Sequence, residues 1–333
     1  MVCIFLLLTA NPGLGEEKQK FSDMGTCRLE SGKDIRDCRI GYRTFGRMNA
    51  DKTNVVIFPT WFMGTAEQLG GFIGEGKMID SGKYFVIAID AIGNGVSSSP
   101  STSAGQGGAF FPQFTIRDMV DIQHRFITKT FGLKRAHAVA GISMGGMQAL
   151  EWMVAYPGFA RKTISIVGTP CLTSYDLILW RAELLALECG KQDAAGGKSA
   201  MDLVAHIHSL VAYTPSHVAG TTSREAVPGY MKEMEKTLGK YSTDNWAAQL
   251  QAIMAHDIYR KFAGSPQETA KTVRTHALII VSEEDHMVNT LPAMELAPLI
   301  KAETAILASK CGHFAFLCDR EKIAAIVSRF LDK

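Results

Sequence analysis

The chain has 333 residues, and 47% of them are hydrophobic, which is ample for a large buried core. Its 35 Lys and Arg residues nearly balance its 33 Asp and Glu residues, the formal charge is +2, and the charges are dispersed along the chain. This composition excludes a nucleic-acid-binding surface, and the lack of a glycine-rich phosphate loop outside residues 141–146 predicts no nucleotide cofactor.

The N-terminus carries a short apolar run. Residues 2–10 (VCIFLLLTA) lead into the stretch 11–15 (NPGLG), a pattern typical of a signal-peptide core and its small-residue cleavage zone. The run is too short to cross a membrane, so no stable membrane insertion is predicted. The positively charged segment that begins a signal peptide is missing. A start codon assigned too far downstream would explain its absence. We interpret residues 1–20 as a truncated signal segment and predict a secreted or periplasmic protein, with a cytoplasmic protein as the alternative.

The cysteine count agrees with export. There are seven cysteines, and cleavage of the signal segment would leave an even six. Cys27 and Cys38 flank the turn-like stretch 31–34 (SGKD) at symmetric spacing, which predicts that they lie opposite each other in a β-hairpin and form a disulfide. Two free buried thiols are the alternative. Cys311 and Cys318 are a second candidate pair.

Two runs in the first half predict buried strands, 54–59 (NVVIFP) and 135–140 (RAHAVA). The second is followed by a G-x-S-x-G pattern at 141–145 and then by 147–155 (MQALEWMVA), which has helical spacing and good helix formers. Ser143 therefore stands on a strand-to-helix turn, where a strained backbone presents the hydroxyl as a nucleophile and glycines avoid a clash. The alternative is a serine that only caps the helix.

A serine that attacks an acyl group needs amide donors for the oxyanion that forms. One donor is usually the amide of the residue after the nucleophile, here Met144, and the other comes from the loop after an earlier strand. That loop is 60–65 (TWFMGT), and we assign its donor to the backbone amide of Phe62. The alternative is that Trp61 and Phe62 only cap the core at the end of a strand.

A long segment in the middle of the chain has a different pattern. Residues 170–265 show helix-like periodicity, as in 177–187 and 246–255, and no strand pattern. Both ends of the segment return to strand-like runs, which favours an insertion over an independent helical domain with its own partner. We predict that this insertion is a lid, with 196–197 and 215–222 as its loops.

The domain organisation follows from these assignments. We predict one core, made of residues 21–169 and 266–333, with the helical lid at 170–265 inserted into it.

The segment after the insertion supplies a candidate acid for the serine. Residues 276–281 (HALIIV) predict a strand that ends at a polar loop, 282–286 (SEEDH), at the sheet edge where open α/β sheets place their sites. Asp285 is our candidate, because an acid is needed to orient the base of a serine nucleophile. Glu284 is an alternative acid, and His286 an alternative base.

The base is assigned to His313. It follows a predicted strand at 304–307 and precedes a closing helix at about 319–331. The resulting order along the chain, serine then aspartate then histidine, is that of the α/β-hydrolase fold. The other histidines have no acid or nucleophile in an obvious relation. His206 and His208 lie two residues apart, which suits neither one helix face nor a metal site, so no metal is predicted.

Four stretches resemble the homoserine O-acetyltransferase family of α/β-hydrolases. They are 115–126 (TIRDMVDIQHRF), 141–157 (GISMGGMQALEWMVAYP), 283–289 (EEDHMVN) and 311–316 (CGHFAF). The continuation after the serine is more specific to that family than the G-x-S-x-G pattern itself. The resemblance covers nearly everything from about residue 21 to residue 330.

The resemblance implies a fold and a site. The fold is a mostly parallel central sheet flanked by helices, with an inserted helical lid that covers the site. Ser143, Asp285 and His313 are the implied catalytic triad, and the amides of Phe62 and Met144 are the implied oxyanion hole. No cofactor is implied, the partner is a small-molecule ester, and a homodimer is the assembly to be tested.

One departure from the family concerns the substrate. The acetyltransferases have an aspartate directly after the catalytic histidine, where it meets the amino group of homoserine, and this chain has Phe314. Losing such a charge-assisted contact weakens recognition of homoserine. Trp61, Arg181 and Phe314 are the candidate substrate contacts, and Arg181 stands roughly where the family has a lid arginine. We therefore predict a serine hydrolase of short-chain acyl esters, with a homoserine O-acetyltransferase-like acyltransferase as the alternative.

Overall fold

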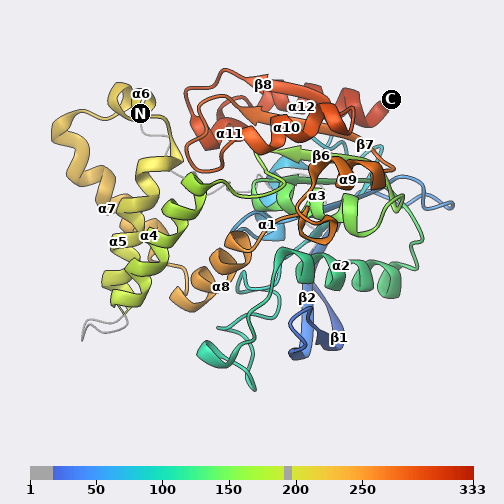
Figure 1. Ribbon diagram of the computed structural model, residues 1–333, viewed down its shortest axis with the longest axis horizontal. Helices are drawn as coiled ribbons and strands as arrows, with labels where there is room; N and C mark the ends of the chain where they lie inside the picture. Colours follow the sequence, from blue (N-terminus) through green and yellow to red (C-terminus); the bar gives the residue numbers. More distant parts are fainter. Residues whose placement is uncertain (1–17, 191–196) are drawn as a thin grey trace.

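The computed structural model describes residues 18–190 and 197–333. Their strands form one sheet in the order β1-β2-β4-β3-β5-β6-β7-β8. The pairs β1–β2 and β2–β4 are antiparallel, and the pairs from β4 through β8 are parallel. Helices flank this sheet (Figure 1), so the predicted fold, a mostly parallel sheet flanked by helices, is confirmed.

The strands have the following bounds: β1 Lys20–Arg28, β2 Asp34–Phe45, β3 Val55–Pro59, β4 Phe85–Ile89, β5 Ala136–Ile142, β6 Ala160–Ile166, β7 His276–Ser282 and β8 Glu303–Leu307. The helices are α1 Ala66–Leu69, α2 Ile116–Phe131, α3 Met144–Ala155, α4 Ser174–Gly190, α5 Gly197–Ala212, α6 Pro215–Thr221, α7 Val227–Leu238, α8 Thr243–Met254, α9 Pro266–Thr272, α10 Leu291–Leu299, α11 Ala315–Cys318 and α12 Arg320–Asp332.

The central strands are apolar on both faces because helices cover both sides of a parallel sheet. Every residue of β3 is buried, and so are six of the seven residues of β5 and of β7. The edge strand β8 is mostly exposed. The four strands predicted from the sequence correspond to β3, β5, β7 and β8, and the predictions are confirmed to within two residues at each end.

Helices α4 to α8 lie between β6 and β7, within the segment predicted to be an insertion. Figure 1 shows α4 to α7 gathered together to the left of the sheet. The described part of this segment contains no named strand. The prediction of a loop at 215–222 is wrong, because α6 forms there. Its first turn is stabilised by Pro215 and by the Thr214 hydroxyl, which accepts a hydrogen bond from the His217 amide.

The N-terminal hairpin forms, but its register differs from the prediction. Cys27 pairs with Ile35, and Cys38 pairs with Gly25, which has a φ of 63° at a register shift. The chain reverses within residues 29–33, earlier than the stretch 31–34 predicted from the sequence, so the two cysteines are not opposite.

The predicted Cys27–Cys38 disulfide is therefore corrected to a pair of free, buried thiols. They hydrogen-bond each other, which lowers the pKa of Cys27 and raises that of Cys38.

Most of the predicted signal segment, residues 1–17 of 1–20, lies outside the described residues. Within residues 18–190 and 197–333, no helix combines the length and the apolar character needed to cross a membrane.

Candidate active site

Ser143 lies on the sharp turn between β5 and α3. Its backbone has a φ of 55° and a ψ of −122°, a conformation that L residues rarely adopt. The glycines of the motif are needed for packing: a Cβ on Gly141 would lie 1.9 Å from the Gly145 carbonyl oxygen, and one on Gly145 would lie 2.6 Å from the Pro59 carbonyl oxygen. Ser143 stands at the N-cap position of α3 but forms no capping hydrogen bond, so its hydroxyl is available for another partner.

That partner is His313, which lies in a short 3₁₀ turn at Gly312–Phe314. Its Nε2 is 2.8 Å from the Ser143 Oγ, and its Nδ1 is 2.7 Å from the Asp285 Oδ2. The structure thus brings together three side chains from distant parts of the chain. Ser143 and Asp285, for example, are more than a hundred residues apart. All three are almost completely buried. A serine, an imidazole and a carboxylate in this chain of contacts form the arrangement needed to activate a hydroxyl nucleophile.

Asp285 is held by its own loop after β7. Its Oδ1 accepts hydrogen bonds from the backbone amides of Met287 and Val288, each at 2.9 Å. The Oδ2 is left to face His313. The alternative acid Glu284 is exposed, and the alternative base His286 forms no hydrogen bond with Ser143.

The loop after β3 lines the same cavity as Ser143. The amides of Met63 and Gly64 are used: Met63 donates to the Gln249 side chain at 2.8 Å, and Gly64 donates to the Trp61 carbonyl. In the described part of the chain, the amides of Phe62 and Met144 have no acceptor. Two such donors are what an oxyanion requires, and these are the two residues predicted for that role.

The same loop is fixed from three directions. The side-chain Nε2 of Gln148 on α3 donates to the Thr60 carbonyl at 2.9 Å, and the side-chain Oε1 of Gln249 on α8 accepts from the Met63 backbone amide. The buried Asp90 accepts from the Ala66 amide at 2.8 Å, and burial raises the pKa of this carboxyl. These contacts keep the loop in place before any substrate binds, which is the condition for an oxyanion hole to lower a barrier.

A cavity of about 90 Å³ is lined by Ser143 and His313. Trp61 and Phe314, two of the predicted substrate contacts, line it, together with other aromatic and apolar side chains. Among the described residues, no Asp, Glu, Lys or Arg side chain lines this cavity. The space therefore suits a small apolar group next to the nucleophile.

Arg181, the third predicted substrate contact, does not line the cavity. Its side chain is 51% exposed and forms an ion pair with Glu188 at 3.2 Å. Helical phase explains the correction: Trp180, Glu183 and Leu184 of α4 face inward, and Arg181 falls on the opposite, solvated face.

A second histidine, which the sequence analysis left without a role, lies in the cavity. His208 of α5 lines the same space as Ser143, and its Nδ1 is 3.0 Å from the Oε1 of Glu183 on α4. A signal in the sequence could have identified both. Each interrupts an apolar stripe at helical spacing, Glu183 within Trp180, Leu184 and Leu187, and His208 between Val204 and Val211.

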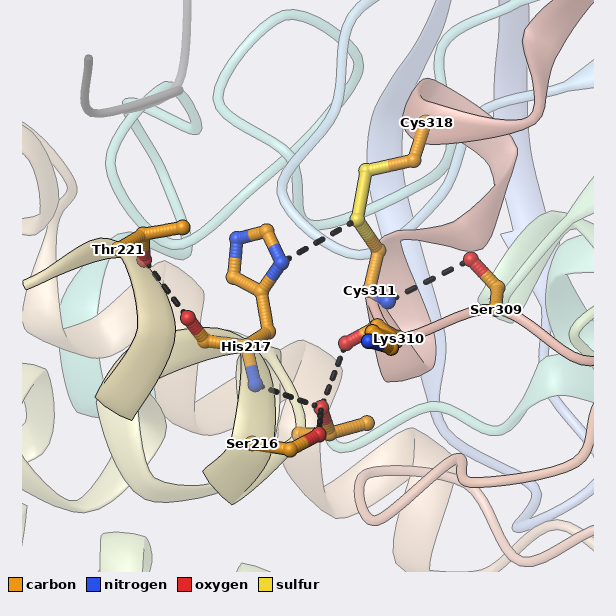
Figure 2. Close-up of a disulfide and its surroundings, with 8 residues drawn as sticks. Ser216, His217, Thr221, Ser309, Lys310, Cys311 and Cys318 are labelled. Carbon is orange, nitrogen blue, oxygen red and sulfur yellow. Dashed lines mark hydrogen bonds between the residues drawn. A yellow bond between two sulfur atoms is a disulfide. The ribbon is translucent and has the colours of Figure 1, made fainter.

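A disulfide connects Cys311 and Cys318, the second candidate pair, and brackets the His313 turn. Figure 2 shows His217 of α6 directed at this disulfide, with its Nδ1 3.7 Å from the Cys311 Sγ. The Thr214 hydroxyl donates to the Lys310 carbonyl at 2.6 Å. Helix α6 of the insertion therefore contacts the loop that carries the candidate base.

Replacing Cys318 with serine should lower the free energy of unfolding by about 2–3 kcal/mol, because the bridge closes a short loop in the unfolded chain. Ester turnover should fall as well, since the His313 turn loses its constraint. Urea unfolding monitored by circular dichroism measures the first effect. Cys189→Ser, which removes an exposed free thiol, is the control and should change neither property. Equal unfolding free energies for Cys318→Ser and the native chain would contradict the prediction.

A family model described as alpha/beta hydrolase fold matches residues 53–319, most of the chain. The chain belongs to the α/β-hydrolase fold family. This confirms the family-level part of the resemblance predicted from the sequence.

Relatives of two kinds match this α/β-hydrolase. An ethyl acetate hydrolase of Pseudomonas veronii is 37% identical over 158 residues, which is 47% of this chain and 45% of that protein, so the match spans just under half of the relative. A homoserine O-acetyltransferase of Methanohalophilus mahii is 27% identical over 345 residues, covering 91% of this chain and 70% of that one. The match to acetyltransferases confirms the predicted resemblance.

Among solved structures, an acetylester hydrolase from Corynebacterium glutamicum has a TM-score of 0.88 and 23% identity, covering 95% of this chain and 96% of that chain. At this identity the similarity shows the fold alone.

Proposed function

We propose that this α/β-hydrolase cleaves short-chain carboxylic esters by way of an acyl-enzyme on Ser143. The observation that carries the proposal is the continuous chain of contacts from Ser143 through His313 to Asp285, at 2.8 and 2.7 Å. Ser143 and His313 line a mostly apolar cavity. The curated relatives include one named for ester hydrolysis.

In the first half of the reaction, the Ser143 Oγ attacks the ester carbonyl carbon and His313 Nε2 takes the hydroxyl proton. The carbonyl oxygen becomes an oxyanion, which the amides of Phe62 and Met144 stabilise. The tetrahedral intermediate then collapses. The bond to the alcohol oxygen breaks, and His313 returns its proton to that oxygen, so a neutral alcohol leaves.

In the second half, His313 takes a proton from a water molecule that attacks the acyl carbon. The same two amides stabilise the second oxyanion. The bond to the Ser143 Oγ breaks, Ser143 regains its proton from His313, and the carboxylic acid leaves. Asp285 holds the imidazole in the tautomer that can accept the proton at Nε2 and stabilises the imidazolium that forms.

The choice of water over an amino-alcohol acceptor rests on the lining of the cavity. Phe314 stands directly after His313, and its ring packs near those of Tyr213 and Phe316. In the described part of the chain, the cavity offers no carboxylate for an ammonium group. A cation over a ring face would recover only about 0.5–2 kcal/mol, less than a buried charge-assisted contact.

The alternative function is transfer of an acetyl group from acetyl-coenzyme A to an alcohol such as homoserine. The homoserine O-acetyltransferase relative, which matches 91% of this chain, favours it. Both functions pass through an acyl-enzyme on Ser143. They differ in the acyl donor, an ester or the thioester of acetyl-coenzyme A, and in the acceptor, water or an alcohol.

One preparation can separate the two functions. Ethyl acetate, n-butyl acetate and p-nitrophenyl acetate should be hydrolysed, whereas coenzyme A release from acetyl-coenzyme A should be slow and unchanged by L-homoserine. The Ser143→Ala protein, assayed in parallel, gives the background. Efficient homoserine-dependent release, with O-acetylhomoserine identified by mass, would overturn the hydrolase and establish the acyltransferase.

We propose that the protein is secreted or periplasmic, the location predicted from the sequence. The Cys311–Cys318 disulfide supports this, because structural disulfides persist mainly in secreted and periplasmic proteins. Non-reducing peptide mapping of protein isolated from its own cells tests the placement. Free thiols at both positions would favour the cytoplasmic alternative.

A further inference from the structure

Helix α8 of the insertion contacts the loop that carries the candidate oxyanion donor Phe62. Trp246 and Gln249 lie about one turn apart on α8, and both are buried. The ring of Trp246 packs edge-on against that of Phe62, with the ring centroids 4.6 Å apart. The side chain of Gln249 accepts a hydrogen bond from the backbone amide of Met63. The insertion therefore contacts two consecutive residues of this loop.

The side chain of Gln249 is held from two sides. Its Oε1 accepts from the Met63 amide at 2.8 Å, and its Nε2 donates to the Ile92 carbonyl at 2.9 Å. A Cβ on Gly93 would lie 2.9 Å from the Gln249 Cγ, so the glycine leaves the room in which this side chain packs. The reverse orientation of the carboxamide would place two donors and two acceptors together. The two partners therefore fix the orientation of the group, and an amide keeps this pattern at every pH.

Residues 61–64 of the loop form a tight turn, closed by a hydrogen bond from the Gly64 amide to the Trp61 carbonyl at 3.0 Å. Among these four residues only Met63, the third, has a positive φ, which is 54°. This is the pattern of a type II turn, whose third position is usually occupied by Gly or Asn. A methionine has a Cβ and prefers the negative φ that a type I turn gives this position. The observed turn is therefore opposed by the residue that it contains.

The contact with Gln249 accounts for the observed turn. Type I and type II turns share the hydrogen bond between their first and fourth residues and differ by a rotation of the central peptide, here the one between Phe62 and Met63. The bond from Gly64 to Trp61 is compatible with both turns. The bond from the Met63 amide to Gln249 involves the central peptide itself. Rotation of that peptide would leave a buried N–H and the Oε1 without partners, and would tilt the adjacent peptide that carries the Phe62 amide.

We propose that Gln249 of the insertion is a positioning residue for the oxyanion hole. It holds the peptide between Phe62 and Met63 against the conformational preference of Met63, and this keeps the Phe62 amide directed at the carbonyl oxygen of the reacting acyl group. The insertion thereby contributes to the chemical step. The proposal rests on the proposed acyl-enzyme at Ser143, and it holds whether water or an alcohol is the acceptor, because both reactions form an oxyanion.

Gln249→Met keeps the length of the side chain and removes the amide that accepts from Met63 and donates to Ile92. With p-nitrophenyl acetate, kcat should fall roughly ten- to hundredfold, less than the loss of about a hundred- to a thousandfold that follows removal of an oxyanion donor itself. KM should stay within about twofold of the native value, because the contact acts on a charge that develops only in the transition state. Steady-state kinetics measure both, and far-UV circular dichroism checks the fold.

Asn245→Leu is the matched control on the same helix. Asn245 is also buried, and it accepts from the Ser101 amide at 3.0 Å and donates to the Ser101 hydroxyl at 2.7 Å. The control thus removes a comparable pair of hydrogen bonds between α8 and a different loop. It should keep kcat within about threefold of the native value. A loss as large as that in Gln249→Met would mean that any loosening of α8 has this effect, and would overturn the specific role of Gln249.

A glycine at position 63 provides a rescue that a merely structural role would not explain. Glycine adopts a φ of 54° without strain, so the turn no longer depends on Gln249. Met63 lines the cavity, so the kcat of Met63→Gly is not compared with that of the native protein. The readout is the factor by which Gln249→Met lowers kcat in each background. It should shrink to about threefold or less in the Met63→Gly background, and an equal factor in both would overturn the proposal.

The outcomes separate this role from the proposed function. If the native protein hydrolyses no ester, the proposed hydrolysis fails, and the same variants are compared by coenzyme A release from acetyl-coenzyme A with L-homoserine. A native kcat in Gln249→Met, with whichever substrate the protein turns over, would overturn the role of Gln249. Should Gln249→Met not fold, Gln249→Asn takes its place in the same comparisons. This variant keeps a polar amide and withdraws it from Met63 by one CH₂ group.

Discussion

Replacing Ser143 with alanine should abolish ester hydrolysis, with a loss of kcat on the order of a million-fold. The substitution removes the Oγ that lies 2.8 Å from His313 and leaves no other hydroxyl in that contact. Steady-state assays with p-nitrophenyl acetate on the purified variant measure the loss.

The variant must also be shown to fold, because Ser143 has a φ of 55° that alanine must adopt as well. Far-UV circular dichroism and Tm should match the native protein. His313→Ala should give a similar loss, and the double variant should be no worse, because members of one catalytic unit are not additive. Ser165→Ala, which removes a buried hydroxyl close to the same turn, is the control and should remain active. Activity above a few per cent in Ser143→Ala would remove the assignment of the nucleophile.

Replacing Asp285 with asparagine should lower kcat by roughly ten-thousand-fold while the geometry stays intact. The Oδ1 of Asp285 accepts from the Met287 and Val288 amides at 2.9 Å each, so the oxygen of an asparagine should keep these contacts. Its NH₂ group must then take the position of Oδ2 and donate to the Nδ1 of His313. That contact places the imidazole proton on Nε2, and such a ring cannot accept the proton of Ser143.

The same carboxylate-to-amide change at Glu284 tests which of the two acids orients His313. Glu284→Gln, a carboxylate-to-amide change at the adjacent exposed position, should retain native activity. The kcat values of both variants, measured with the same ester, decide between them. A large loss in Glu284→Gln with an active Asp285→Asn would transfer the acid to Glu284, the alternative that the sequence left open.

The sequence alone was sufficient for features that depend on local pattern. The turn that carries Ser143 is one such feature. It is predicted by a strand-like run, by glycines two residues before and after Ser143, and by a helix-like run. The close approach of Gly141 to Gly145 gives the physical reason for those glycines. Asp285 and His313 were selected because each follows a predicted strand. In a parallel sheet the carboxyl ends of the strands share one edge, so chain order and strand ends were enough to bring these side chains together.

Features that depend on how separate elements meet were decided only by the tertiary structure. The hairpin register was mispredicted because the chain reverses at residues 29–33 and shifts at Gly25, which no symmetric spacing of Cys27 and Cys38 can show. Arg181 faces solvent because the packing of α4 sets which face of the helix is buried. The position of Arg181 along the chain does not determine that face.

The pair of His208 and Glu183 is the clearest case. Each side chain by itself is a polar interruption of an apolar stripe, and its meaning depends on the partner on the other helix, 25 residues away along the chain. Local pattern was enough to select Ser143, Asp285 and His313, which the structure brings into contact. The packing of α4, α5 and α8 against one another decided which further polar group reaches the cavity, because that is a property of the contact between helices and of no helix alone.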